Sequence, residues 1–269
     1  MHSHLIGILA IVLYLIASAL LAVVLVRGKD SIVGGKYTAI GIGLAGVALH
    51  GLVLYPELVT ASGLNLGFFN ASSLIGLFMA LLLLLIAMGR PVENLGIAML
   101  PLAALTVALM FAFPTRHIVN DRPSWALDIH IALSVLAYSL LAMAALQALV
   151  LAIQDHQLHN RHPGGVIRSL PPLQTMESLL FQMIGVGFVL LSFALISGFM
   201  FLEDIFTQHL VHKTVLSIVA WVVFAVLLWG RWRFGWRGRI AIRWTLGGFV
   251  VLMLGYFGTK IALQLVLHR

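Results

Sequence analysis

The sequence predicts an all-α, polytopic membrane protein: a bundle of eight transmembrane helices with both termini outside, in the periplasm. Of its 269 residues, 61% are hydrophobic and only 9% are charged, whereas a soluble domain carries about a quarter charged residues. The apolar residues gather in eight runs, most of them near the roughly 20 residues that a helix needs to cross a bilayer. Glycine and proline separate the runs, as at Gly34-Gly35 and Pro171-Pro172. This composition excludes a soluble enzyme, a secreted domain and a disordered chain.

The predicted spans follow one another without room for a soluble domain. In chain order they are Leu5 to Val26, Tyr37 to Val59, Gly67 to Met88, Leu95 to Phe113, Ala126 to Gln154, Leu179 to Leu202, Val215 to Gly230 and Ile240 to Leu267. The longest connection follows Gln154, so residues 1–269 are expected to form a single integral-membrane domain. Ala17-Ser18-Ala19 mimics a signal-peptide cleavage site, but no Lys or Arg precedes Leu5 and the apolar run continues to Val26. We therefore expect a retained first helix.

Basic residues on alternate loops predict the orientation. One side holds 11 of the 16 Lys and Arg residues, including Arg90 and the arginines from Arg231 to Arg243, and the other side holds 5, including Arg116 and Lys213. The side with more basic residues is predicted to be cytoplasmic. The protein is thus expected to be a multi-pass protein of a bacterial inner membrane, with the lipid bilayer as its first partner.

Several other classes of function are excluded or weakened. The chain has no cysteine, so it carries no disulfide, Fe–S cluster or dithiol chemistry of its own. The net charge of +7 is explained by arginines that mark cytoplasmic loops, and no nucleic-acid partner is expected. The segment from Gly41 to Gly46 matches a dinucleotide-binding pattern, but it lies inside a span and is interpreted as helix-packing glycine. The run from Gly230 to Arg239 is interpreted as an anchor of arginines and tryptophans.

Polar residues recur at helical spacing near the predicted outer ends of three spans. They are His130, Ser134 and Tyr138 in the fifth span, Lys213, Ser217 and Trp221 in the seventh, and Tyr256, Lys260, Gln264 and His268 in the eighth. Residues four apart share a helix face, and ionisable groups at membrane depth usually have a function. Lys260 and His268 also fit the alternative of side chains that reach to the interface from a helix end.

His50 lies deeper, in the second span, after the small residues Gly43 and Gly46. A histidine at this depth needs a partner, which can be a metal, a carboxylate or a group on another helix. For both His50 and His130, the sequence leaves open a ligand role and a satisfied hydrogen bond between helices.

Imidazoles without thiolates favour a metal whose other ligands are not protein atoms, and haem b meets that description. A helix bundle can bury a porphyrin, one or two histidines can bind its iron, and its propionates need cations such as Lys260. The hypothesis assigns His130 as axial ligand with His50 or His268 as the second, and Tyr138 as a cofactor contact. An ion or proton path is disfavoured because the spans lack carboxylates at mid-depth.

The chain resembles the cytochrome c assembly protein family, in particular its small YpjD- and HemX-like branch, which is related to CcsA. The resemblance rests on residues in order along most of the chain: Asp128 to Ser134 with Tyr138, Leu170 to Leu173 with Met176-Glu177, Ile184-Gly185, Ile196-Ser197-Gly198, Trp229 to Arg239 and Tyr256 to Gly258. In the CcsA branch, haem is presented at the outer face under a tryptophan-rich motif and held by flanking histidines. The resemblance implies that His130 is the first of these histidines and His268 the second.

Two departures from that family pattern shape the functional hypothesis. The segment from Gly198 to Lys213 has no tryptophan, and Trp229 stands where CcsA has a histidine. The chain is therefore expected to bind, transfer or regulate haem rather than to act as a haem lyase, and no catalytic constellation is found. The alternative hypothesis is a haem-free scaffold or regulatory subunit that docks a transporter or another membrane-protein partner.

Overall fold

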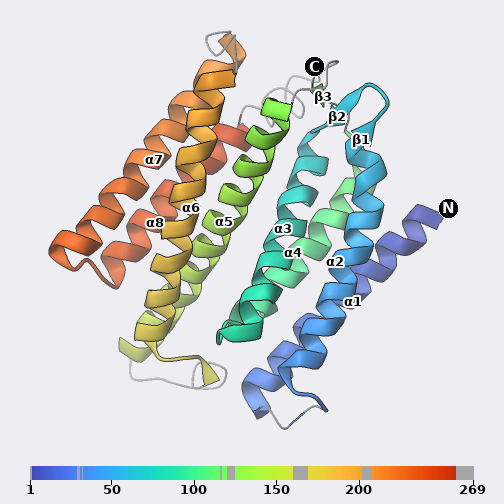
Figure 1. The fold of residues 1–269 in the computed structure, drawn as a ribbon. Coiled ribbons are helices and arrows are strands. Elements are labelled where there is room, and N and C mark those ends of the chain that lie inside the picture. The colour runs from blue at the N-terminus through green and yellow to red at the C-terminus, as the bar shows by residue number, and fades with distance from the viewer. Residues whose placement is uncertain are drawn as a thin grey trace. The chain divides into compact units, whose positions relative to one another are not determined.

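A computed structural model describes residues 2–28, 31, 33–115, 117–119, 125–159, 169–201 and 208–258. Within these residues it contains eight helices that are long and apolar enough to cross a membrane (Figure 1), which confirms the predicted eight-span, all-α bundle. The helices are α1 (His2–Arg27), α2 (Lys36–Leu58), α3 (Phe68–Gly89), α4 (Glu93–Ala112), α5 (Trp125–His159), α6 (Leu173–Phe201), α7 (Gln208–Phe234) and α8 (Arg239–Met253).

The helix ends differ from the predicted spans where polar residues extend a helix beyond its apolar run. α6 begins at Leu173, six residues before the predicted Leu179, and α5 continues past Gln154 to His159. Apolar runs cannot reveal such ends, because a helical turn at the membrane surface does not have to be hydrophobic. α8 is followed by a π-helical turn, η3 (Leu254–Gly258), and the predicted continuation to Leu267 lies outside the described residues.

The helices pack as two compact units, Met1–Pro123 with Pro163–Pro171 and Ser124–His162 with Pro172–Arg269. In the first unit α1 packs against α2 and α4, and α3 packs against the same two helices. In the second unit α5 packs against α6 and α8, and α7 packs against the same two. Each unit is thus a ring of four helices with consecutive helices as neighbours, while the expected single domain over residues 1–269 stays a prediction.

Glycines on α2 let the helices of the first unit approach closely. A Cβ atom at Gly43 would lie 2.9 Å from Leu84 Cδ1 on α3, and one at Gly46 would lie 3.2 Å from Tyr14 Cδ1 on α1. Leu84 and Tyr14 are both fully buried. The contacts of Gly43 and Gly46 agree with the interpretation of this segment as helix-packing glycine, whereas Gly41 is exposed and has no atom within 4 Å of an added Cβ.

A small three-stranded sheet, which no sequence pattern predicted, lies beside the end of α2 and the start of α3. It comprises β1 (Val59–Thr60), β2 (Gly63–Asn65) and β3 (Ile118–Val119), paired antiparallel in that order (Figure 1). The Asn65 side chain accepts hydrogen bonds from the backbone amides of Gly67 and His117 and donates one to the Thr115 carbonyl. Strands of two or three residues are too short to show a period-two pattern.

Candidate functional site

His50 is fully buried in the first unit and sits in a polar chain that joins three helices. Its Nδ1 lies 3.1 Å from the Tyr14 hydroxyl on α1, and its Nε2 lies 2.8 Å from the Ser73 hydroxyl on α3. The Tyr14 and His50 rings also pack edge to face, with their centroids 5.9 Å apart. Both ring nitrogens of His50 therefore have hydrogen-bond partners.

This arrangement accounts for a histidine deep in a span without any ligand. A neutral imidazole has one N–H donor and one acceptor nitrogen, and a hydroxyl can serve as donor or acceptor. Tyr14 and Ser73 can thus satisfy both nitrogens in either tautomer. Iron could bind His50 only after one of these two hydrogen bonds had been broken.

His130, in the second unit, forms hydrogen bonds to the described residues through only one of its ring nitrogens. Its Nδ1 lies 2.9 Å from the Ala194 carbonyl oxygen and 3.0 Å from the Ser197 hydroxyl, both on α6. The Ser197 hydroxyl itself donates to the Ala194 carbonyl at 2.9 Å. His130 lies in the second turn of α5 and is partly exposed.

These contacts determine the tautomer of His130. A carbonyl oxygen can only accept, so Nδ1 carries the proton and donates it to Ala194 O, with Ser197 Oγ as a second acceptor. In the neutral ring Nε2 then holds a lone pair, and it has no hydrogen-bond partner among the described residues. Metal-binding histidines typically donate their other ring N–H to a carbonyl or carboxylate in this way.

Tyr138 lies two turns further along α5 and faces an aromatic cluster from α8 and η3. The centroid of its ring lies 5.5 Å from the ring centroid of Phe249 and 5.7 Å from the ring centroids of Tyr256 and Phe257. Its hydroxyl is buried and has no hydrogen-bond partner among the described residues. A buried polar atom without a partner is costly in a membrane protein, and π-helical turns such as η3 are frequent at functional sites.

The predicted site residues are thus divided between the two units. The structure places His50 in the first unit and His130 and Tyr138 on one helix of the second, whereas Lys260 and His268 lie outside the described residues. Among the residues that the structure describes, no three His, Asp or Glu side chains could together hold a metal ion. The described residues therefore hold no site built from three or more such protein ligands. This result does not bear on a cofactor that takes a single histidine from the described residues.

The sequence did not identify the residues that orient these histidines. Ser197 belongs to the Ile196-Ser197-Gly198 segment, and Tyr14 and Ser73 stand alone in apolar runs. A single hydroxyl residue in a span gives a weak signal, since a serine often bonds to its own helix. Ser72 illustrates this with a 2.7 Å bond to the Phe68 carbonyl.

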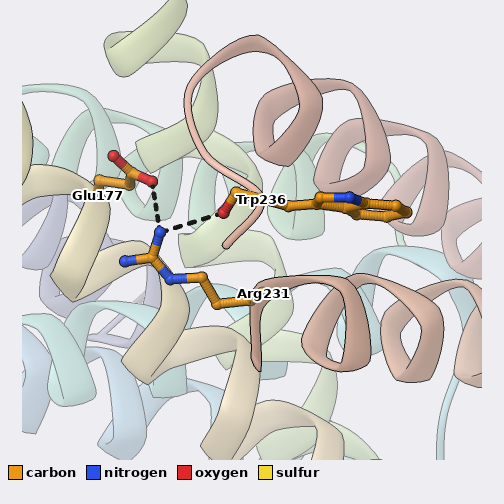
Figure 2. A network of polar contacts seen from close by, with 3 residues as sticks. All are labelled: Glu177, Arg231 and Trp236. Atoms are coloured by element: carbon orange, nitrogen blue, oxygen red, sulfur yellow. Dashed lines mark hydrogen bonds and ion pairs between the residues drawn. The ribbon is translucent and has the colours of Figure 1, made fainter. Parts of the chain in front are cut away.

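A second polar network joins the beginning of α6 to the end of α7 and the turn that follows it. Arg231 Nη1 on α7 donates to Glu177 Oε1 on α6 and to the Trp236 carbonyl, each at 3.1 Å (Figure 2). The guanidinium also stacks over the Phe181 ring at 4.6 Å. Arg231 therefore ties the turn after α7 to the beginning of α6, which is a more specific role than the anchor expected from the sequence.

A model of the family described as "Cytochrome C assembly protein" matches residues 42–267. The chain belongs to the cytochrome c assembly protein family. The match runs through both four-helix units and includes His50, His130 and Arg231, and it confirms the resemblance seen in the sequence.

Individual relatives support this placement. The chain is 33% identical over 266 residues to the inner membrane protein YpjD of Escherichia coli K12, covering 97% of this chain and 98% of that protein. It is 29% identical over 114 residues to the cytochrome c biogenesis protein CcsA of Picosynechococcus, covering 42% of this chain and 34% of that protein. No solved structure matches the chain. With eight apolar spans, these relatives confirm a multi-pass protein of the bacterial inner membrane.

Proposed function

We propose that this protein binds haem b in its second unit, with His130 Nε2 as an axial ligand, and hands it on or regulates its use in cytochrome c assembly. The observation that carries the proposal is the hydrogen bond from His130 Nδ1 to the Ala194 carbonyl. It fixes the ring and leaves the lone pair on Nε2, as a haem-ligating histidine requires. Family membership supports a haem-related role.

Other residues of the chain fit such a cofactor. The buried Tyr138 hydroxyl offers a hydrogen bond that no described residue takes up, and its aromatic neighbours offer an apolar surface. Lys260 stays the proposed partner of a propionate. Because both nitrogens of His50 are in hydrogen bonds, we propose His268 rather than His50 as the second axial ligand. Bound haem would supply an iron centre for ligand exchange or electron transfer, and this chain would hold and orient it.

The test is an absorption spectrum of detergent-purified protein, with and without added haemin. We expect a Soret band that His130→Ala abolishes and that His50→Ala leaves unchanged in position. His268→Ala should shift the band toward that of a haem with one protein ligand. Size-exclusion chromatography of each variant separates loss of haem from loss of fold.

Two results would contradict the proposal. One is a Soret band that survives in a folded His130→Ala protein, and the other is a wild-type protein that takes up no haemin at all. In the second case, a membrane-protein partner that co-purifies in fixed stoichiometry would favour the scaffold hypothesis.

A further inference from the structure

The segment from Trp229 to Arg243, here called the basic turn, carries five arginines and no acidic residue. Two of the five pair with acids from other helices: Arg231 with Glu177, and Arg239 with Asp155 at 3.1 Å. The other three, Arg233, Arg237 and Arg243, are exposed and have no ion-pair partner among the described residues. Arg233 lies at the end of α7, Arg237 between the two helices and Arg243 in the second turn of α8, so these three guanidinium groups are available to a ligand at the junction of α7 and α8.

Exposed aromatic rings lie beside these arginines. The Trp232 side chain is 78% exposed, and those of Trp229 and Phe234 are also largely exposed. The Trp229 and Trp232 rings meet edge to face at 5.6 Å. Tryptophan in such a position favours the boundary between lipid headgroups and hydrocarbon, so the basic turn presents positive charge at the depth of lipid phosphates.

The basic turn is held in one conformation. Arg231 binds the Trp236 carbonyl (Figure 2). The Trp236 ring packs against Trp244 and so closely over Gly230 that a Cβ atom there would overlap it. Gly235 and Gly238 have φ angles of 66° and 54°, which favour glycine over other residues. The backbone of the turn therefore loses little conformational entropy on binding, and the positions from which the three exposed arginines extend are set before a ligand binds.

From these features we propose that the basic turn binds the headgroup of an anionic phospholipid in the leaflet that it faces. Guanidinium groups bind phosphate oxygens through paired hydrogen bonds, and clusters of arginines beside a transmembrane helix attract anionic lipids. The exposed tryptophans decide in favour of a lipid over a soluble phosphate, because a soluble anion makes no use of rings at the hydrocarbon boundary. The proposal is independent of haem binding.

The experiment measures lipid adducts of the purified protein by native mass spectrometry. Phosphatidylglycerol and cardiolipin are compared with phosphatidylethanolamine at equal concentration. The test variant is Arg233→Gln/Arg237→Gln. The matched control is Arg27→Gln/Arg90→Gln, which removes the same charge from exposed arginines on the same predicted side of the membrane, in the first unit. Each basic residue near a membrane surface strengthens the binding of anionic lipid about fivefold, so the test variant should bind anionic lipid about thirtyfold more weakly than wild type, and the control should match wild type.

Tryptophan fluorescence gives a second readout that a general charge effect does not explain. Four of the six tryptophans lie in or at the ends of the basic turn or pack against it: Trp229, Trp232, Trp236 and Trp244. Phosphatidylglycerol brominated on its acyl chains should quench wild-type emission more than brominated phosphatidylethanolamine does, and Arg233→Gln/Arg237→Gln should lose this difference.

Three results would overturn the proposal. The first is equal binding of phosphatidylglycerol and phosphatidylethanolamine by wild type. The second is equal loss in the test and control variants, which would indicate net charge alone. The third is full displacement of the lipid by millimolar inorganic phosphate, which would identify a soluble-anion site.

Discussion

The Tyr14 hydroxyl lies 3.1 Å from Nδ1 of His50, and this contact joins α1 to α2 in the buried centre of the first unit. The opposite nitrogen of the same imidazole lies 2.8 Å from the Ser73 hydroxyl on α3. One ring thus links three helices. Polar contacts of this kind between transmembrane helices contribute about 0.6 kcal/mol on average and up to about 1.7 kcal/mol.

Removing either hydroxyl around His50 should destabilise the protein. We expect Tyr14→Phe and Ser73→Ala each to cost about 1 kcal/mol, since each leaves a buried imidazole nitrogen without a partner. Because both act through one ring, the double variant should deviate from the sum of the two. Unfolding of the purified protein in mixed detergent measures these costs, with Tyr55→Phe at an exposed position as the control. Equal stability of Tyr14→Phe and wild type would show that the chain of contacts is not formed.

The Arg231–Glu177 pair should matter more than the Arg239–Asp155 pair. Both have N–O distances of 3.1 Å, but the side chains of Arg231 and Glu177 are 29% and 14% exposed, against 63% and 36% for Arg239 and Asp155. Removal of one partner from a mostly buried pair leaves a desolvated charge and costs about 1 to 3 kcal/mol, whereas exposed pairs contribute about 1 kcal/mol or less.

Glu177→Gln should therefore lower the melting temperature clearly more than Asp155→Asn does. Each variant removes one negative charge, so they are matched in charge. A similar fall in both variants would mean that the difference in burial has no consequence for stability.

Gly230→Ala should loosen the turn between α7 and α8. An added Cβ atom would overlap the Trp236 ring, and that ring already packs against the rings of Phe234 and Trp244. The ring has to move, which disturbs the backbone carbonyl that Arg231 binds. Gly247→Ala in α8 is the control, because no atom lies within 4 Å of its added Cβ. We expect lower thermal stability and faster proteolysis between α7 and α8 only for Gly230→Ala.

Asn65→Ala should release the small sheet from the start of α3. The amide of Asn65 is buried and makes hydrogen bonds to Gly67, Thr115 and His117, so its loss leaves backbone groups unpaired at a cost of about 2 kcal/mol or more. Limited proteolysis near residues 115–119 should become faster, while the exposed control Ser62→Ala should behave as wild type. A protease-resistant Asn65→Ala protein would contradict this role.

Ser197→Ala tests how His130 is oriented, and it rests on the proposed haem site. The variant keeps the Ala194 carbonyl as acceptor for Nδ1–H but removes the second acceptor, Ser197 Oγ. Partners that orient a metal-binding histidine typically affect metal affinity by 10- to 100-fold; with one of two acceptors kept, we expect haemin affinity to fall about tenfold and the Soret band to persist. Haemin titration measures the change, with Ser178→Ala at an exposed position of α6 as the control. Complete loss of the band in folded protein would assign Ser197 a more direct contact.

The sequence by itself determined the class of the protein and the number of its spans. Eight apolar runs of sufficient length specify eight membrane helices, because a backbone in hydrocarbon must satisfy its hydrogen bonds within the helix whatever its neighbours are. The four-residue spacing also placed His130 and Tyr138 on one helix. The sequence did not predict the end of α5, the start of α6 or the small sheet, because these features depend on polar or very short segments.

Only the tertiary structure decided what each polar side chain meets. The sequence left His50 and His130 with the same two alternatives, yet packing gives His50 two hydroxyl partners and His130 a carbonyl and a hydroxyl that share one nitrogen. Packing likewise determines which of the five arginines of the basic turn pairs with Glu177, namely Arg231. Residue spacing reveals which face of a helix a side chain occupies, but the partner lies on another helix far away in the sequence, so its identity depends on how the helices pack.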